Sequence, residues 1–144
     1  MSLFSTLSIS ASGMSAERTR AELLVENLAN AETTRTPDGG PYRRKDVVFQ
    51  AQPAGSFASV LDSAINASPV GVGVSEVIVD QSAPDQRYLP GHPDAGPDGY
   101  VAFPRINPAE EMVNLMGASR GYQANVASMS AVKDMIQRSI DLLR

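Results

Sequence analysis

The sequence predicts a mainly α-helical protein in which two long terminal helices form an antiparallel coiled coil and the middle segment forms a small antiparallel β hairpin or sheet. Three observations lead to this class. The chain closes with a proline-free stretch, apolar residues recur at heptad spacing near the other end, and the middle is rich in proline, glycine and valine. We expect helices within 1–34 and 107–144, and a β-rich segment over 35–106 with a flexible insert at about 51–69.

The C-terminal helix has a clear start signal. Asn107 suits the N-cap, Pro108 suits the first helical position, and Glu110 lies where a carboxylate can reach back to the cap. Apolar side chains then recur at steps of three and four, which places them on one stripe with a small phase slip. The stripe residues that we expect at an interface are Met112, Leu115, Tyr122, Val126, Met129 and Ile136.

The length of this helix implies partners. It would be roughly 55 Å long, whereas a compact chain of this size has a radius of gyration of about 15 Å. The rest of the chain cannot wrap such a helix. Its narrow stripe must therefore be covered by the other end of the chain or by other subunits.

The N-terminal residues from about Leu3 to Ala31 form the second expected helix. Its heptad-spaced seam is interrupted by Arg18, and the seam residues that we expect at an interface are Leu7, Met14, Ala21, Val25 and Leu28. Gly13 permits close approach of a partner but weakens the helix in isolation. We expect this seam to face the C-terminal stripe. An ordinary amphipathic helix packed on its own domain is the alternative that fits the same pattern.

Polar residues near these seams are also candidates for the interface. Asn27, Asn30 and Asn125 should be hydrogen-bonded if they are buried, because a buried amide without partners is costly. Arg43 and Arg44 belong to a short basic run that can contact an acidic surface on a neighbour. A solvated basic loop explains the same two charges, and charge alone favours that simpler interpretation.

The middle segment shows strand and turn signals in alternation. Val47, Val48 and Phe49 predict a short strand over 45–50, and alternating valines predict another over 70–79. The alternation changes parity near Glu76, which indicates a β-bulge. Residues 82–99 are expected to be a long turn region, because they hold four prolines and three glycines. A last strand is expected over 100–106.

The composition offers little chemistry for catalysis or metal binding. The chain has no cysteine, one histidine and a net charge of −4, which argues weakly against nucleic acid as a partner. His92 has no second histidine or cysteine with which to share a metal, and Asp94 and Asp98 are explained by turn formation. We therefore expect no cofactor, no metal site and no enzymatic activity.

Targeting signals are equally sparse. No apolar run approaches the ~20 residues that span a bilayer, so we expect no direct membrane insertion. The first residues lack the basic and apolar regions of a secretory signal peptide. If the protein leaves the cytoplasm, we expect it to use another route.

Several motifs in order resemble the bacterial flagellar rod proteins, and within them the FlgC family of proximal-rod proteins. In the first half these are Ile9-Ser-Ala-Ser-Gly-Met14-Ser-Ala, Asn27-Leu-Ala-Asn30-Ala, and Gly39-Gly-Pro-Tyr-Arg-Arg-Lys45 with Val47-Val-Phe49. In the second half they are Pro90-Gly-His-Pro-Asp94, Glu111-Met-Val-Asn-Leu-Met116 and Ala118-Ser-Arg-Gly-Tyr-Gln-Ala-Asn125. The match covers both ends and most of the middle, and is weakest at 51–69.

The resemblance implies a structural role in the periplasmic part of the flagellar basal body. Similar proteins stack helically with themselves and other rod proteins into the shaft that carries torque from the membrane ring to the distal rod and hook. Membrane-ring or rod-adaptor proteins are further implied partners. Such proteins pass through the flagellar type III export apparatus without a cleaved signal peptide.

Two alternatives compete with this interpretation. The chain could be a free coiled-coil adaptor or assembly factor that binds one partner helix, which a discrete stable monomer or small oligomer would favour. It could instead be an enzyme such as a wall hydrolase. That class requires paired carboxylates or a metal site, and the sequence offers neither convincingly.

Overall fold

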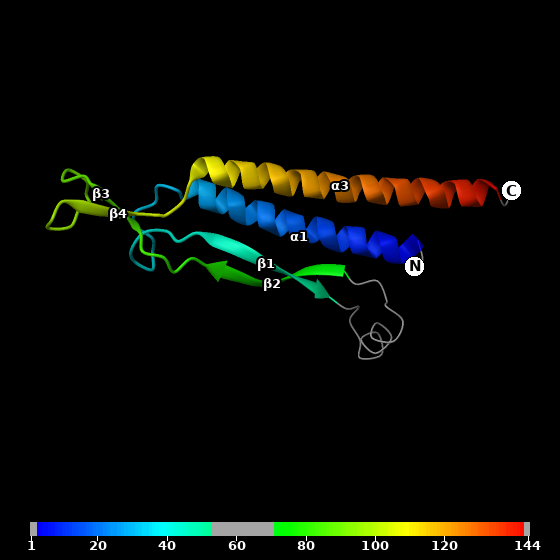
Figure 1. The fold of residues 1–144 in the computed structure, drawn as a ribbon, viewed down its shortest axis with the longest axis horizontal. Helices are drawn as coiled ribbons and strands as arrows, with labels where there is room; N and C mark the ends of the chain where they lie inside the picture. The colour runs from blue at the N-terminus through cyan, green and yellow to red at the C-terminus, as the bar shows by residue number, and fades with distance from the viewer. Residues whose placement is uncertain (1–2, 53–70, 143–144) are drawn as a thin grey trace.

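The computed structural model describes residues 3–52 and 71–142 and shows an elongated molecule. The elements in chain order are α1 (Leu3–Ala29), β1 (Lys45–Gln52), β2 (Gly71–Val79), β3 (Asp85–Tyr88), β4 (Tyr100–Phe103) and α3 (Pro108–Asp141). The two helices run side by side in opposite directions, as the sequence predicted (Figure 1). The mainly helical class with a small antiparallel β part is thereby confirmed.

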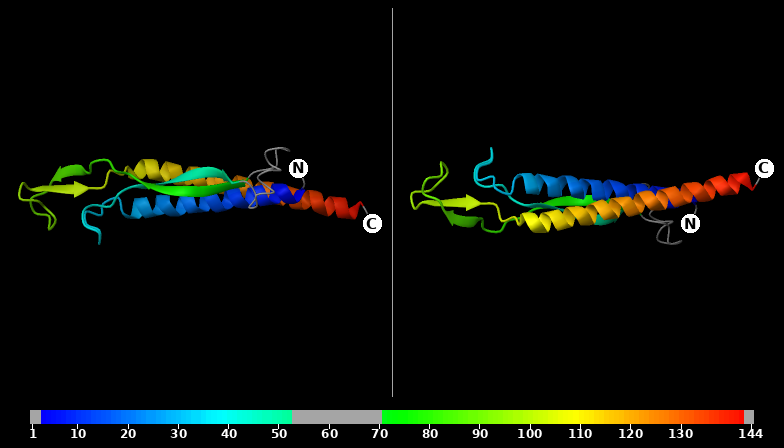
Figure 2. Two further views of the ribbon diagram at one scale, coloured as in Figure 1. Left: turned by 90° about the horizontal axis from the view of Figure 1, so that it is seen from below. Right: turned by 90° about the horizontal axis from the view of Figure 1, so that it is seen from above.

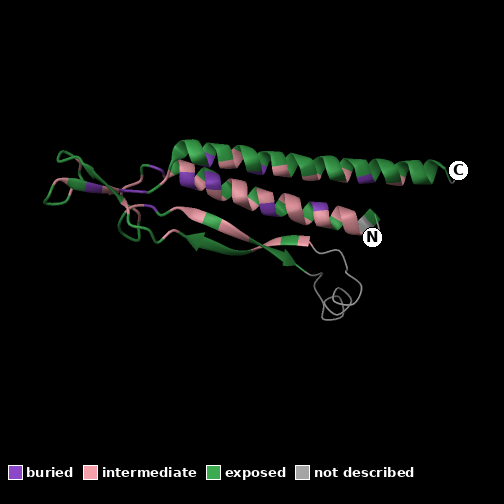
Figure 3. Cartoon of the chain, viewed as in Figure 1, coloured by how far each residue is buried: buried purple, intermediate pink, exposed green. Residues whose placement is uncertain are grey.

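Helix α1 is the central layer of the molecule. It contacts α3 on one side and both strands of the β1–β2 hairpin on another (Figure 1). The short β3–β4 hairpin projects beyond the helices, at the end opposite the C-terminus (Figure 2). Figure 3 shows that α3 is exposed over most of its outer surface, whereas most residues of α1 are intermediate or buried.

The strands form two separate antiparallel sheets of two strands each. In the first, the register runs from Lys45 opposite Val79 to Gln52 opposite Gly71. The register shifts between Val48 and Phe49, which leaves Ser75 as an extra residue in β2. The bulge predicted near Glu76 is thus confirmed, one residue away.

Two predictions for the middle segment need correction. Strand β3 lies in the region predicted to be a long turn; its side chains are all exposed, so it carries no apolar alternation. It forms because its backbone pairs with β4 and because the Arg87 guanidinium lies 4.4 Å from the centre of the Phe103 ring. The predicted insert begins too early, since Ala51 and Gln52 belong to β1. Residues 53–69 of that insert lie outside the described residues.

The helix ends follow their capping residues. The Asn107 side chain accepts a hydrogen bond from the Ala109 N–H at 3.1 Å, which confirms the predicted N-cap. Helix α1 ends at Ala29, where Asn30 Nδ2 donates to the Glu26 carbonyl at 2.9 Å. The same carbonyl also accepts a hydrogen bond from the backbone N–H of Asn30 at 3.1 Å, so Asn30 is tied to the last turn of the helix by two hydrogen bonds.

The apolar core is small and divided in two. One part lies along the helices and contains Ala16, Leu24, Ala118 and Val132. The other lies where the β3–β4 hairpin joins the helices and contains Ala31, Tyr42, Val101, Phe103 and Pro104. Neither part is large enough to cover the apolar residues of the helices, so many of them stay on the surface.

Candidate subunit interface

The contact line between α1 and α3 is built from small and polar residues. A Cβ atom added to Gly13 would lie 3.0 Å from the Asn125 side chain, and one added to Gly121 would lie 3.0 Å from Glu17. At the far end of the line, Asn27 Nδ2 donates to Glu111 Oε2 at 3.1 Å. Glycine at two of these levels lets the helix backbones approach closely.

These three contacts define the register of the helix pair. Along α1 they advance from 27 to 17 to 13, while along α3 they advance by the same steps from 111 to 121 to 125. On this register Leu3 is level with residue 135, so α3 extends beyond the described start of α1 by about a turn and a half. Figure 1 shows this overhang at the C-terminal end.

The predicted seams lie beside this contact line rather than on it. The inward face of α3 carries Glu111, Ala118 and Val132, which are buried at intervals of seven and fourteen residues. Met112, Tyr122 and Val25 are 52%, 41% and 51% exposed in the single chain. The pKa of Arg18 in α1 is raised mainly by its hydrogen bond to Glu22, with a small contribution from Tyr122, so Tyr122 lies near α1. Five other predicted residues are partly covered: Ala21, Leu28, Asn30, Leu115 and Asn125.

Larger apolar residues of both helices line an open groove along one side of the contact line. It encloses about 510 Å³ and is lined by Leu7, Met14, Val126, Met129, Ser130, Lys133, Ile136 and Gln137. Five of these residues are predicted interface residues. We call this feature the apolar groove. The small residues of the contact line bring the helices together, and the longer side chains beside it form the walls.

The opposite end of the helix pair holds a buried polar cluster, which we call the polar clip: Asn27, Tyr42, Arg44, Lys45 and Glu111. The Asn27 amide is fully enclosed and makes four hydrogen bonds. Its Nδ2 donates to the Lys45 carbonyl and to Glu111, and its Oδ1 accepts from the Lys45 N–H and the Tyr42 hydroxyl. The expectation that Asn27 would be hydrogen-bonded if buried is confirmed.

Glu111 completes the clip with a charge. Its side chain is 2% exposed, and its Oε1 accepts from Arg44 Nε at 2.7 Å. This hydrogen bond is the main reason that the pKa of Arg44 is raised. Burial, followed by the negative charges of Glu26 and Glu111, raises the pKa of Tyr42 to about 12. The clip thus joins the end of α1, the start of β1 and the start of α3.

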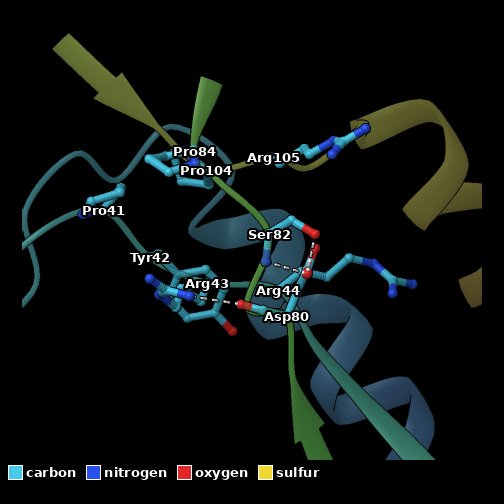
Figure 4. A pocket seen from close by; sticks show the side chains of 9 residues that line it. All are labelled: Pro41, Tyr42, Arg43, Arg44, Asp80, Ser82, Pro84, Pro104 and Arg105. Carbon is cyan, nitrogen blue, oxygen red and sulfur yellow. Dashed lines mark hydrogen bonds between the residues drawn. The ribbon is translucent and has the colours of Figure 1, made fainter. Parts of the chain in front are cut away.

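The arginines of the basic run form ion pairs and hydrogen bonds within the chain. Arg44 pairs with Glu111 and with Asp46, while Arg43 donates to the Asp80 carbonyl and to Gln81. Figure 4 shows Arg43, Arg44 and Asp80 around a narrow pocket of about 50 Å³. Its other lining residues are Pro41, Tyr42, Ser82, Pro84, Pro104 and Arg105. Hydrogen bonds from the Ser82 hydroxyl and N–H lower the pKa of Asp80. Exposed Arg43 is the better placed of the two predicted arginines for an outside partner.

The turn that follows β3 is tied back to the loop after α1. Asp94 accepts from the Thr34 hydroxyl at 2.8 Å and lies 3.6 Å from Arg35 Nη1. The N–H of Asp94 donates to His92 Nδ1 at 3.1 Å. The predicted turn residues therefore hold the two loops together.

The surface area of the chain indicates how much contact remains to be made. It exposes 9825 Å², whereas a compact 15.3 kDa monomer exposes about 7,100 Å². The chain thus exposes roughly 2,700 Å² more surface than a compact monomer of its mass. That surplus is within the range of permanent subunit interfaces. Exposed apolar side chains also cover the hairpin: Phe49, Val72, Val77, Ile78 and Val79.

Sequence reasoning missed the central residue of the clip, Glu111. It was visible only as an acid in the first turn of the C-terminal helix, where it complements the helix dipole. A better signal is its spacing of seven residues from Ala118 and fourteen from Asn125, which puts all three on one helix face. Tyr42 carried no comparable signal.

The described part of the chain shows neither a metal-binding cluster nor a helix that could span a membrane. Within residues 3–52 and 71–142, no three side chains of histidine, cysteine, aspartate or glutamate gather closely enough to hold a metal ion. None of the helices in the described part of the chain combines the length and apolar character needed to cross a membrane.

Comparison with known proteins identifies the family. Residues 98–142 match the family model described as flagellar basal body rod FlgEFG protein C-terminal. Over its full length the chain resembles curated proteins named flagellar basal-body rod protein FlgC. That of Bacillus subtilis is 39% identical over 149 residues, covering 99% of both chains. That of Borreliella burgdorferi is 36% identical over 151 residues, covering 100% of this chain and 99% of the relative.

A third relative, the FlgC of Escherichia coli O157:H7, is 39% identical over 142 residues, covering 99% of this chain and 98% of the relative. These relatives are structural rod proteins rather than enzymes, and they give no support to the free-adaptor alternative. Full-length similarity at this level, together with the paired terminal helices, shows that the chain belongs to the FlgC family of flagellar basal-body rod proteins and is a structural rod subunit.

Proposed function

We propose that the chain stacks helically with other rod proteins and with copies of itself to form the proximal part of the rod, which transmits torque from the membrane ring to the distal rod and hook. The observation that carries this proposal is the exposed apolar surface of the chain, which includes Met112, Val113 and Met116 of α3. Apolar surface of that extent favours association, at about 25 cal/mol per Å² removed from water.

The three segments have different parts in this proposal. Segments 1–34 and 107–144 form the helical core of the rod subunit, and 35–106 supplies the β hairpins outside that core. Predicted interface residues that remain accessible support the division, in particular Met14, Met112, Tyr122 and Val126. Arg43 is exposed beside the core and is the proposed contact for an acidic surface of a neighbour.

The proposal extends to location and partners. We place the subunit in the periplasmic rod, next to other rod proteins, with membrane-ring or rod-adaptor proteins as further partners. It reaches the rod through the flagellar export apparatus, without a cleaved signal peptide. No catalytic step and no cofactor form part of this function, and neither nucleic acid nor membrane insertion is involved.

Loosely folded helix ends would suit both export and assembly. Isolated helices are marginal in water, and the end of the pair that holds the apolar groove lacks the polar clip. We expect hydrogen exchange in a dilute monomer to be slow near Asn27 and Glu111 and to become faster toward Leu3 and Asp141. Protease-resistant, strongly protected ends in the dilute monomer would contradict this part of the proposal.

The deciding experiment is mass spectrometry of basal bodies from the source bacterium, stripped of filament and washed hard. We expect this chain to be recovered together with other rod proteins. Its absence from intact basal bodies that retain those proteins would refute the rod assignment. A discrete soluble complex with a single partner helix would then favour the adaptor.

A further inference from the structure

Helix α3 is held in place by α1 and by the polar clip. Among the described helices and strands, α3 packs against α1 alone, and neither hairpin supports it. Within the described part of the chain, the axial position of α3 on α1 therefore depends on two features. One is the contact line between the helices, and the other is the set of bonds that Glu111 makes in the clip.

The contact line selects an axial position only weakly. Gly13, Ala16, Ala118 and Gly121 have no side chain long enough to interlock with the facing helix. Asn125 lies opposite Gly13, but its Nδ2 donates at 3.0 Å to the Gly121 carbonyl of its own helix. Small residues allow close approach, whereas large side chains that fit between those of the partner are what fix the position of one helix along another.

Glu111 fixes this position much more strictly, because it is bonded to two other parts of the chain at once. Its Oε1 accepts from Arg44 Nε at 2.7 Å, and its Oε2 accepts from Asn27 Nδ2 at 3.1 Å. Asn27 is in turn bonded to both the N–H and the carbonyl of Lys45. Hydrogen bonds act over a short range, so a movement of α3 by one turn would break both bonds of Glu111.

The sequence of α3 also fits a second position on α1. A Cβ at Gly117 meets nothing within 4 Å, so the observed contacts do not explain this glycine inside a helix. If α3 moves four residues along α1, about 6 Å, Gly117 replaces Gly121 beside Glu17. By the same movement Gly121 replaces Asn125 beside Gly13, so glycine is present at both levels. We call this arrangement the shifted register.

The intact chain prefers the observed register because the shifted one loses the clip. Glu111 would move to the level of Leu23, away from Arg44, and the buried Asn27 amide would lose an acceptor. Asn114 would also replace Ala118, which is 1% exposed, at its buried position. The bonds of Glu111 are thus the main difference that a single substitution can remove.

We propose that Glu111 is the residue that selects the register of the helix pair, and that without its bonds α3 also adopts the shifted register, one turn away. The clip is then a lock against axial movement of one helix along the other, in addition to its contribution to stability. Movement by one turn of a packed element is an established kind of two-state transition. The inference concerns the single subunit and goes beyond the proposed rod function.

Distances between two spin labels in the purified monomer test the lock. The chain has no cysteine, so labels can be attached through Ser8→Cys and Val113→Cys at two exposed positions. In the observed register these positions are separated by roughly 26 Å along the helix axis, and in the shifted register by about 20 Å. Pulsed electron resonance should show one distance with Glu111 present, and a second, shorter distance in Glu111→Ala.

Two further substitutions distinguish sliding from general loosening. A methyl group at residue 117 has open space in the observed register but would crowd Glu17 in the shifted one. Gly117→Ala added to Glu111→Ala should therefore reduce the shorter distance at least tenfold. Glu110→Ala changes an exposed acid in the same turn and should leave the single distance unchanged.

Circular dichroism establishes first that each variant keeps its helices. If Glu111→Ala does not fold, Glu111→Gln takes its place, because it preserves the length of the side chain and removes one of the two acceptors. A single unshifted distance in the folded variant, a shorter distance that Gly117→Ala does not reduce, or the same change in Glu110→Ala would overturn the lock. These results leave the rod function untouched, which mass spectrometry of basal bodies tests separately.

Discussion

The two ends of the helix pair differ in the kind of side chain that they place between the helices. At one end the polar clip encloses Asn27 and Glu111, and the Asn27 amide has all four of its hydrogen bonds within the chain. At the other end Leu7, Met14 and Val126 line a groove that the described chain leaves open. The polar side chains at the first end have their partners within the subunit, while the apolar side chains at the second end line an open groove.

A charge at the open end should have the largest effect. We expect Val126→Glu to abolish swimming and to remove the chain from basal bodies, because the carboxylate would be buried without a partner on assembly. The side chain is 41% exposed in the free subunit, so expression and monomer folding should change little. Ala127→Glu, at an exposed neighbouring position, is the control and should assemble better. Normal flagella in Val126→Glu would contradict the groove assignment, as would normal flagella in Met14→Glu.

Removing a side chain from the polar clip should lower the stability of the subunit rather than its assembly. Glu111→Ala leaves Arg44 without its buried partner and removes the Oε2 acceptor of the Asn27 amide. Arg44 is partly exposed and keeps its pair with Asp46, but a buried N–H of Asn27 loses its acceptor, which costs about 1–3 kcal/mol. Urea unfolding of the purified chain should show that loss, whereas Glu110→Ala, which changes an exposed acid in the same turn, should stay within about 0.5 kcal/mol. Equal stability of the two variants would show that the clip does not hold the fold together.

Alkaline unfolding offers a finer measure of the same cluster. The pKa of Tyr42 is about 12 in the folded chain, against an ordinary value of about 10, so folding favours the protonated phenol. Its contribution to stability is complete below pH 10 and is lost as the pH rises from about 10 to 12. Tyr42→Phe removes this decline and costs about 1 kcal/mol near neutral pH through the lost hydrogen bond to Asn27. Urea midpoints measured from pH 7 to 11 should separate the two chains, and parallel curves would argue against the raised pKa.

The smallest expected effect comes from two glycines of α3. A Cβ at Gly117 meets nothing within 4 Å, so Gly117→Ala should stabilise the helix by about 0.5–1 kcal/mol. At Gly121 the new methyl group would crowd Glu17, whose Oε2 is buried, and the gain should be cancelled. Thermal unfolding of the two variants tests this, and an equal rise in Tm would show that the helices are not in close contact at Gly121.

The sequence predicted the helices and strands better than it predicted which face of each helix is buried. Helix starts, the bulge and the antiparallel pairing followed from local rules that depend on few residues, such as the Asn107 cap. The residues of the contact line could not be predicted in this way, because apolar periodicity assigns the largest apolar residues to the most buried face of a helix. Here Gly13, Gly121 and Asn125 occupy that face, and Met14 and Val126 stand beside it.

The reason is that the residues that make contacts within the subunit differ from the large apolar residues that stay exposed. Within the subunit, small residues allow close packing and a polar cluster supplies specific contacts. Large apolar residues such as Met112 and Tyr122 stay exposed, so periodicity detects surface that the single chain does not cover. Strand β3 was not predicted for a different reason: it forms by pairing with β4 and has no apolar alternation in its own sequence.

The equal spacing of contact residues along α1 and α3 limits where residues can be inserted or deleted. Gly13 and Asn27 are separated by the same number of residues as Glu111 and Asn125, and the contacts at both levels require that equality. One inserted codon between either pair would turn the rest of that helix by about 100° and misplace one of the two contacts. Natural insertions and deletions should therefore be absent from these two intervals and accumulate in the connections between elements.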